Sequence, residues 1–384
     1  YPRSSPGHFS DVKKKLKGFV ESGQLGIFSG GYWGHPGYKL PAEANLMAVS
    51  HYLDALAWQR EVAKLHTIFG GKNPHPNFVC GGVPCPVDPN AEGAINMAAL
   101  SQVSSLITQM EDFVNQAYLP DTLAIASFYK DWGAMGEGVG NFLCYGDFPT
   151  GDTNDISSFL VPRGVILDRD LSTIHDVDLH EEGQIEEYVD HAWYKYRDGK
   201  GTGLHPYDGE TELNYTGPKP PYTQLNVDGE YSWLKSPRWK GKPMEVGPLS
   251  RMLMLYAKGH DQAKELVDST LRTLDVPVEA LFSTLGRTAA RTLETKIYLD
   301  MMRGWYNDLV ANIAAGDLQT HNDEFWDPST WPSVAKGAGY MEAPRGALGH
   351  WIVIKNRKID NYQAIVPTTW NAGPRDSDGV SGPY

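Results

Sequence analysis

Residues 343–370 read APRGALGHWIVIKNRKIDNYQAIVPTTW. Two β-branched-rich runs flank the polar connection Asn356-Arg357-Lys358, which predicts two short strands joined by a tight turn. Proline fixes φ and cannot continue a strand ladder, so Pro344 and Pro367 mark rigid corners. Because a hairpin brings the outer ends of its strands together, we expect both corners at the same end.

The first of these corners is the candidate site for chemistry. Arg345 follows Pro344 directly, and an arginine offers a planar fork of donors that stays charged at any working pH. Thr368 and Thr369 follow the second corner and add two hydroxyls. This combination suits a small, electron-rich ligand. The simpler alternative, which the hairpin alone favours, is an edge hairpin whose arginine pairs with a carboxylate.

Length and charge limit the class of protein. The 384 residues are 41% apolar and 21% charged, enough to build a sizeable core. No linker rich in Gly, Ser or charge divides the chain, so we expect one domain. A formal net charge of −13 argues against nucleic acid or an anionic membrane surface as partner. No apolar run approaches the roughly 20 residues that a membrane span needs.

The three cysteines, Cys80, Cys85 and Cys144, cannot form a disulfide framework. Cys80 and Cys85 are close in sequence, but no second pair completes a set of four metal ligands. The pattern therefore favours buried thiols.

One cluster of histidines and glutamates has the residue types that zinc accepts. Its spacing is not that of an H-E-x-x-H helix, and acidic residues in the first turn of a helix over about 182–196 explain it more simply. The residues are His175, His180, Glu181, Glu182 and His191.

Hydrophobic periodicity predicts an α+β fold with a long-helix core. Helices are expected over 11–20, 41–68, 96–118, 247–273 and 277–315, and a β-like run over 123–126. The helical core covers about 40–118 and 247–315, a smaller mixed α/β portion covers about 119–246, and the active-site hairpin covers 339–370.

One face of the 277–315 helix carries Arg287, Arg291 and Glu294. Their spacing predicts an ion-paired helix surface, with contact to a partner subunit as the alternative. Two prolines flank His75 and fix its backbone. That setting indicates a structural turn whose imidazole bonds a carbonyl.

Six segments in one order resemble the large subunit of a nickel–iron uptake hydrogenase of the membrane-bound respiratory kind. The resemblance extends over essentially all 384 residues. The segments are Gly70-Gly71-Lys72-Asn73-Pro74-His75-Pro76, Gly81-Gly82-Val83-Pro84-Cys85, Tyr231-Ser232-Trp233-Leu234-Lys235-Ser236-Pro237-Arg238, Leu285-Gly286-Arg287-Thr288-Ala289-Ala290-Arg291, Ala343-Pro344-Arg345-Gly346 and Val366-Pro367-Thr368-Thr369-Trp370.

The resemblance implies a binuclear centre whose ligands are not in this sequence. In that family, four cysteines from two Cys-x-x-Cys motifs hold nickel, and two of them bridge to an iron that carries one CO and two cyanides. Neither motif occurs here, and Cys80 departs from the aliphatic residue expected at its place. We therefore expect an internal fragment that does not bind the metals or turn over by itself.

The resemblance also assigns roles to residues of the two corners. The Arg345 guanidinium would lie over the open side of the metal pair, where a fixed positive charge polarises H2. The two cyanides would be surrounded by Pro344, Pro367 and Thr368. The CO would be surrounded by a water-free apolar surface formed by Leu348 and Val366. A magnesium ion would face the backbone carbonyl of Ala364, and His75 would lie beside the partner's nearest iron–sulfur cluster.

The expected partners are a small subunit with iron–sulfur clusters and, through it, a membrane cytochrome b. The substrate is H2, and the location is the periplasmic face of the bacterial inner membrane. One alternative is a non-catalytic hydrogen sensor or scaffold of the same assembly. A more distant alternative is a carbohydrate hydrolase with two carboxylates, for which no convincing pair is present.

Overall fold

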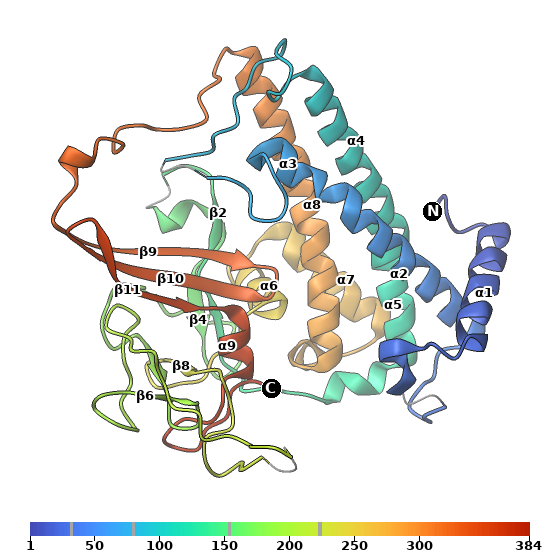
Figure 1. The fold of residues 1–384 in the computed structure, drawn as a ribbon. Helices are drawn as coiled ribbons and strands as arrows, with labels where there is room; N and C mark the ends of the chain where they lie inside the picture. Colours follow the sequence, from blue (N-terminus) through green and yellow to red (C-terminus); the bar gives the residue numbers. More distant parts are fainter. Residues whose placement is uncertain (31–33, 79–80, 153–154, 222–224) are drawn as a thin grey trace. The chain divides into compact units, whose positions relative to one another are not determined.

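The computed structural model describes residues 1–30, 34–78, 81–152, 155–221 and 225–384 (Figure 1). The chain divides into two compact units. Unit 1 consists of Tyr1–Lys130 and Thr295–Trp331, and unit 2 of Asp131–Glu294 and Pro332–Tyr384. The single domain expected from the sequence stays a prediction.

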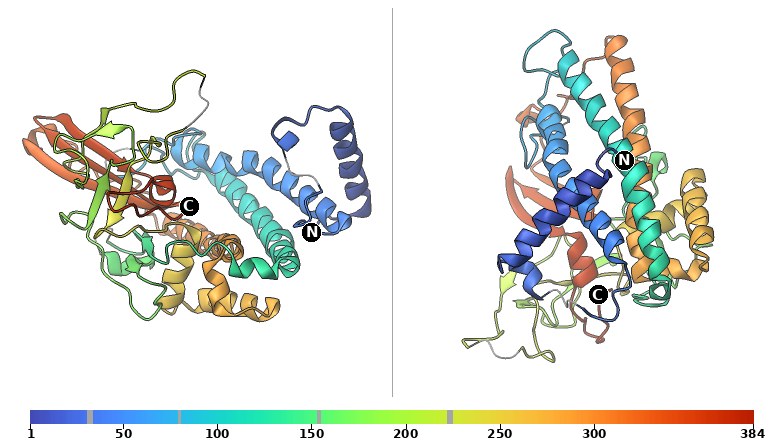
Figure 2. Two further views of the ribbon diagram at one scale, coloured as in Figure 1. Left: turned by 90° about the horizontal axis from the view of Figure 1, so that it is seen from below. Right: turned by 90° about the vertical axis from the view of Figure 1, so that its right-hand side faces the viewer.

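Unit 1 is built from helices. They are α1 (Pro6–Glu21), the 3-10 helix η1 (Gly26–Gly30), α2 (Ala42–Val62), α3 (Lys64–Gly70), α4 (Met97–Phe113), a π-helical turn η2 (Val114–Tyr118), α5 (Leu119–Phe128), η3 (Lys130–Ala134), which continues into unit 2, and the second part of α8 (Thr284–Ala314). Helix α1 packs on α2 (Figure 2). The predicted helices are confirmed here.

The prediction of a β-like run over 123–126 is wrong, because these residues lie in α5. Pro120 stands in the first turn of this helix, directly after the π-helical turn Val114–Tyr118. Four apolar residues in a row cannot distinguish a strand from a helix segment by periodicity alone. The helix that precedes them in the chain extends through the π-helical turn and decides the conformation.

The core of unit 1 joins α4 to α8. Val103 and Ile107 of α4 pack with Leu299 of α8, and all three are buried. At the edge of this core, the Arg303 guanidinium binds both oxygens of Glu111, each at 2.8 Å. This pair is geometrically ideal, since the fork of arginine matches a carboxylate.

The Gly81-Gly82 pair allows two segments of unit 1 to approach closely. A Cβ on Gly81 would lie 2.2 Å from the carbonyl oxygen of Asn322, and one on Gly82 would lie 2.2 Å from that of Thr320. Both glycines have positive φ. Only glycine fits this contact, which gives a physical reason for one of the six segments.

Unit 2 contains small antiparallel sheets. They pair β1 (Phe142–Cys144) with β4 (Gly164–Ile166), β2 (Asp147–Pro149) with β3 (Phe159–Val161), β5 (Ile185–Tyr188) with β8 (Ser236–Trp239), and β6 (Tyr194–Lys195) with β7 (Glu212–Leu213). The predicted helix over about 182–196 is wrong, since β5 and β6 occupy it. Ile185 and Glu187 point into the core, so the run alternates as a strand does.

The largest sheet has three strands in the order β11-β10-β9. These are β9 (Val334–Ala343), β10 (Gly346–Lys355) and β11 (Lys358–Ile365), labelled as adjacent arrows in Figure 1. Trp351 and Trp370 are buried beneath it with Tyr145 and Met244. Large aromatic side chains contribute much of the apolar area that holds such a small sheet in place.

Helices α6 (Pro248–Ala257), α7 (Asp261–Leu274), α9 (Pro367–Ala372) and the first part of α8 complete unit 2. Short 3-10 helices η4 (Ile156–Ser158) and η5 (Val278–Phe282) belong to it as well, and η6 (Pro328–Thr330) belongs to unit 1. The helix predicted over 247–273 is interrupted between α6 and α7, where Gly259 has a φ of +79°. The α+β class is confirmed.

Among the described residues, no helix has both the length and the apolar character that crossing a membrane requires.

The Glu111–Arg303 pair predicts a pH-dependent contribution to stability. Hydrogen bonding to Arg303 lowers the pKa of Glu111, so its stabilising effect is present above the ordinary pKa of 4.5 and is lost as the pH falls through the lowered value. Arg303→Gln should reduce the free energy of unfolding by up to about 1 kcal/mol at neutral pH and by much less at an acid pH below the lowered pKa of Glu111. Denaturant unfolding at both pH values measures the difference.

The exposed Arg60 serves as control, and Arg60→Gln should leave stability unchanged at either pH. An Arg303→Gln loss that is equal at both pH values would assign the effect to packing of the side chain instead of its charge.

Candidate functional site

The hairpin predicted from residues 343–370 is present. β10 pairs antiparallel with β11 from Gly349↔Ile365 to Lys355↔Lys358, and Asn356 and Arg357 turn the chain with φ of +50° and +63°. Pro344 and Arg345 connect β9 to β10, and Pro367 begins α9. The register places both proline corners at the same end of the hairpin, as expected. The third strand, β9, was not predicted.

Residues at the second corner alternate between the core and the surface. Gln363, Ile365, Pro367 and Thr369 are buried, while Ala364, Val366 and Thr368 are exposed. Successive side chains of a strand point to opposite faces, which explains the alternation up to Val366. Pro367–Thr369 form the first turn of α9, in which Thr368 is the exposed residue. The buried set anchors the segment, and the other set is exposed. The exposed set consists of three residues singled out from the sequence.

Arg345 is exposed and has no ion pair or side-chain hydrogen bond with any residue that the structure describes. Pro344 beside it is exposed, and Leu348 on β10 is partly buried. The edge-hairpin alternative, in which the arginine pairs with a carboxylate, is therefore not observed within the described residues. The guanidinium keeps all of its donors available for a ligand.

The turn that carries Arg345 packs on the backbone of Val246 and Gly247. A Cβ on Gly346, where φ is +131°, would lie 2.6 Å from the Gly247 nitrogen and 2.5 Å from Val246 Cγ2. A Cβ on Gly247, where φ is +123°, would lie 2.8 Å from the Arg345 carbonyl oxygen. Two glycines thus let two backbones touch, which fixes the height of the turn above α6.

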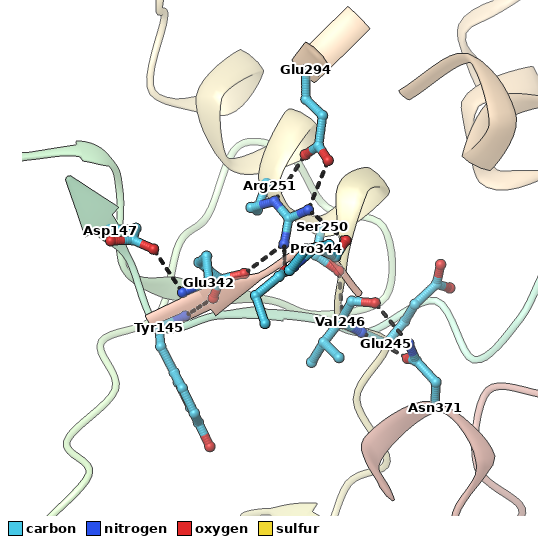
Figure 3. A network of polar contacts seen from close by, with 11 residues as sticks. Tyr145, Asp147, Glu245, Val246, Ser250, Arg251, Glu294, Glu342, Pro344 and Asn371 are labelled. Atoms are coloured by element: carbon cyan, nitrogen blue, oxygen red, sulfur yellow. Dashed lines mark hydrogen bonds and ion pairs between the residues drawn. The ribbon is translucent and has the colours of Figure 1, made fainter. Parts of the chain in front are cut away.

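Arg251 of α6 binds the same turn from within (Figure 3). Its Nη1 donates to the Ala343 carbonyl at 2.9 Å and to Glu342 at 3.1 Å, and its Nη2 donates to the Pro344 carbonyl at 3.1 Å. Nε and Nη2 each donate to Glu294 at 2.8 Å. The second Glu342 oxygen accepts from the Tyr145 N–H at 2.7 Å.

Burial opposes the charges of this network. Desolvation raises the pKa of Glu342, although Arg251 and the Tyr145 N–H act in the opposite direction. Glu294 shows the same balance, because burial raises its pKa more strongly than the Arg251 hydrogen bonds lower it. Such a cluster is costly unless every charged group is bonded, as it is here.

The segment Glu245–Arg251 also reaches the second corner. Val246 donates its N–H to Asn371 of α9 at 3.0 Å and accepts from the Asn371 side chain at 2.9 Å. Glu245 is held by both Nε and Nη2 of Arg287, at 2.6 and 2.7 Å. Arg287 and Glu294 are therefore ion-paired, but the predicted helix surface is wrong. Their partners are Glu245 and Arg251, which are buried in unit 2.

A second polar cluster lies beside Ala364. Gln363 on β11 accepts from Lys235 Nζ at 3.3 Å, and Lys235 lies 3.8 Å from Glu187. Both charged groups are buried, and burial raises the pKa of Glu187 to about 7 and lowers that of Lys235. The ion pair thus lies next to the strand that carries the proposed magnesium-facing carbonyl.

The cysteines do not lie on the exposed side of the corners. Cys144 is buried beside the Glu342 side chain, Cys85 is partly buried with its thiol 3.1 Å from the Ile68 carbonyl, and Cys80 lies outside the described residues. The described residues contain no group of three or more His, Cys, Asp or Glu that could hold a metal ion. His75, in unit 1, is exposed with a φ of +57°, and its imidazole bonds no carbonyl of a described residue.

The histidines of the cluster between 175 and 191 serve the packing of unit 2. His175 lies against the Trp239 ring, His180 is 2.8 Å from the Tyr207 hydroxyl, and His191 is 2.7 Å from the Gly229 carbonyl oxygen. These three imidazoles therefore contact three different partners.

Comparison with known proteins agrees with this architecture. The family model described as nickel-dependent hydrogenase matches residues 1–384. The chain belongs to the nickel-dependent hydrogenase family. It is 52% identical to the uptake hydrogenase large subunit of Rhodobacter capsulatus and 48% identical to the hydrogenase-1 large chain of Escherichia coli, in each case over 100% of this chain and 66% of the relative. The chain thus spans just under two thirds of these relatives.

Solved hydrogenases share the fold. The Ni-Fe-Se hydrogenase of Desulfovibrio vulgaris Hildenborough, in its as-isolated oxidized state, aligns with a TM-score of 0.71 and 30% identity over 90% of this chain and 65% of that chain. The Ni-Fe-Se hydrogenase of Desulfomicrobium baculatum, in a reduced, active form, aligns with a TM-score of 0.70 and 29% identity over 90% and 65%. The resemblance seen in the six segments is confirmed at the level of family and fold.

The sequence does not reveal the residues that support the corners in this chain. Arg251, Glu294 and Glu342 are far apart in sequence, and their convergence depends on the tertiary fold. One feature of the sequence does indicate a buried ion pair. Arg251 is the only charged residue within the run of Pro248–Leu255, and a charge in an otherwise apolar helix implies a buried partner.

The close approach at Gly346 predicts that the chain does not tolerate a side chain there. Gly346→Ala should lower the free energy of unfolding by about 2 kcal/mol or more, because the methyl group overlaps the backbone of Gly247. Gly241 also has a positive φ, but no atom lies within 4 Å of its Cβ position. Gly241→Ala measures the cost of a positive φ in open space, at +75° against +131° for Gly346, and equal losses in the two variants would show that the contact with Gly247 is unimportant.

Proposed function

We propose that this chain works in the large, catalytic subunit of a nickel–iron uptake hydrogenase, which oxidises H2 to protons and electrons. The family and the printed names of the relatives support the proposal. The structural observation that supports it best is Arg345. An exposed cation with no ion pair among the described residues, on a corner fixed by two glycines and a buried arginine, suits electrostatic catalysis more than stability.

The residues at the two corners fit a nickel–iron centre that carries CO and cyanide. Cyanide nitrogens are hydrogen-bond acceptors, and Arg345 and Thr368 offer donors on the exposed side. Pro344 and Pro367 keep these donors on rigid backbone, while Leu348 and Val366 offer apolar surface to CO, which needs no donor. The thiolates that hold the metals would come from outside this sequence.

When bound, the centre supplies the site at which H2 is split heterolytically. The contribution of this chain is a charge that is present before the reaction begins and does not titrate. A guanidinium on a fixed turn stabilises developing negative charge without reorganisation. Once the bound centre covers them, the apolar side chains of Leu348 and Val366 would exclude water there and strengthen that effect.

Magnesium is a further proposed component. The Ala364 carbonyl is the oxygen that would face it, and Ala364 is exposed at a point where the buried Gln363, Lys235 and Glu187 lie just beneath the strand. Magnesium prefers oxygen ligands and keeps several waters, which suits a single backbone carbonyl as one of its ligands.

The proposed partner is a small subunit whose iron–sulfur clusters receive the electrons, with His75 beside the cluster nearest the active site. Through that subunit the enzyme would be membrane-associated, pass electrons to a membrane cytochrome b and lie on the periplasmic face of the inner membrane. These proposals follow from the resemblance to respiratory uptake enzymes. The exposure of the His75 imidazole is compatible with an interface.

Arg345→Lys tests the proposal in the complete protein, matured with its partner. The variant should retain nickel but lose roughly 10²- to 10³-fold in the rate of H2-dependent dye reduction, because a point charge replaces a planar fork. Arg357 is an exposed arginine in the turn at the opposite end of the same hairpin, and Arg357→Lys should keep the wild-type rate.

Absence of nickel and of dye reduction in the wild type would overturn the proposed function. Nickel binding without turnover would favour the hydrogen sensor instead. A normal rate for Arg345→Lys would refute the role of Arg345 alone.

A further inference from the structure

Arg251 is almost completely buried, with 1% of its side chain exposed, and it is fully engaged. Arginine has five N–H donors, and the contacts of Arg251 with Glu294, Glu342, Ala343 and Pro344 supply five oxygen acceptors. Two of these acceptors are backbone carbonyls, and both belong to the residues directly before Arg345. The guanidinium therefore links two buried carboxylates to one turn (Figure 3).

Three elements hold this guanidinium in place. Arg251 lies on α6, Glu294 on α8 and Glu342 on β9, and the second Glu342 oxygen is bonded to the Tyr145 N–H. The backbone N–H of Glu342 donates in turn to Asp147 at 2.9 Å. A cation tied to this many groups cannot rotate without breaking several charge-assisted bonds.

The Pro344 carbonyl is part of the peptide plane that includes the nitrogen of Arg345. Fixing this oxygen fixes the plane, since the peptide unit is rigid. The direction in which the Arg345 side chain leaves the backbone is then determined by one remaining rotation, which the contact of its own carbonyl with Gly247 restrains. Arg345 itself has no described side-chain partner that could do this.

We propose that Arg251 is a positioning residue for Arg345: by binding the two carbonyls before it, Arg251 sets the direction in which the Arg345 side chain leaves the backbone, with Glu294 and Glu342 holding Arg251. The inference rests on the proposed function and adds a residue that acts through Arg345. A lysine could not replace Arg251, because its three donors on one nitrogen cannot reach acceptors spread around a planar fork.

The test uses the complete protein matured with its partner, and Arg251→Lys is the first variant. It should retain nickel and lose roughly 10- to 100-fold in H2-dependent dye reduction, as expected for a misplaced catalytic group. Arg251→Lys should cost little more when Arg345→Lys is already present, because the group that it positions has been replaced. Hydrogen exchange of backbone amides in residues 343–349 should become faster.

Arg238 provides a matched control. It is also 1% exposed, pairs with Asp376 at 2.6 Å and donates to the carbonyls of Pro237 and Val380. Arg238→Lys removes an equally buried fork from unit 2 without touching the turn. It should leave exchange in residues 343–349 unchanged, and its effect on rate should be the same with or without Arg345→Lys.

Glu294→Gln covers the case in which Arg251→Lys does not fold. Both Glu294 oxygens bind Arg251, so this nearly isosteric change reaches the turn through Arg251. A several-fold loss of rate that disappears in the Arg345→Lys background supports the proposal. A wild-type rate with unchanged exchange, or a loss that multiplies with that of Arg345→Lys, overturns it. If the wild type does not oxidise H2, the proposed function fails, while exchange still decides whether Arg251 holds the turn.

Discussion

The geometry of unit 2 depends on a charge placed where water cannot reach it. The Arg251 guanidinium is tolerated in the interior only because two carboxylates and two carbonyls satisfy it together. Removing any one of these acceptors leaves a buried donor unpaired, which costs more than the bond contributed. Helices α6 and α8 and strand β9 must therefore meet at this point in one arrangement. The turn after β9 is held rigid because its carbonyls bind the same guanidinium.

Ladder bonds close only one of the two corners. β9 and β10 pair up to Ala343↔Gly346, so Pro344 and Arg345 form a turn between paired strands, whereas the pairing of β10 with β11 ends at Ile365, before Pro367. Residues 245–251 restrain both corners, since Val246 bonds Asn371 at one corner and Gly247 contacts Arg345 at the other. The two corners are thus held by one short segment, so their side chains keep a constant relation.

Local patterns predicted the elements whose conformation is decided locally. The hairpin followed from β-branched runs and a polar turn, and its corners followed from prolines, because each of these restricts the backbone of the residues concerned. β9 carries glycines, alanines and polar residues without a clear period, and pairing with β10 makes it a strand. Glu342 and Arg251 are 91 positions apart, a separation at which spacing carries no information.

The two arginines of this site have the same chemistry and opposite environments. Arg251 has every donor bonded and stabilises the turn, whereas Arg345 is exposed and has no side-chain partner among the described residues. The alternation of buried and exposed residues from Gln363 to Thr369 repeats this division, since the buried side chains anchor the backbone from which Ala364, Val366 and Thr368 are presented. A rigid interior is what allows an exposed cation to act without reorganising, because the restraint is supplied during folding.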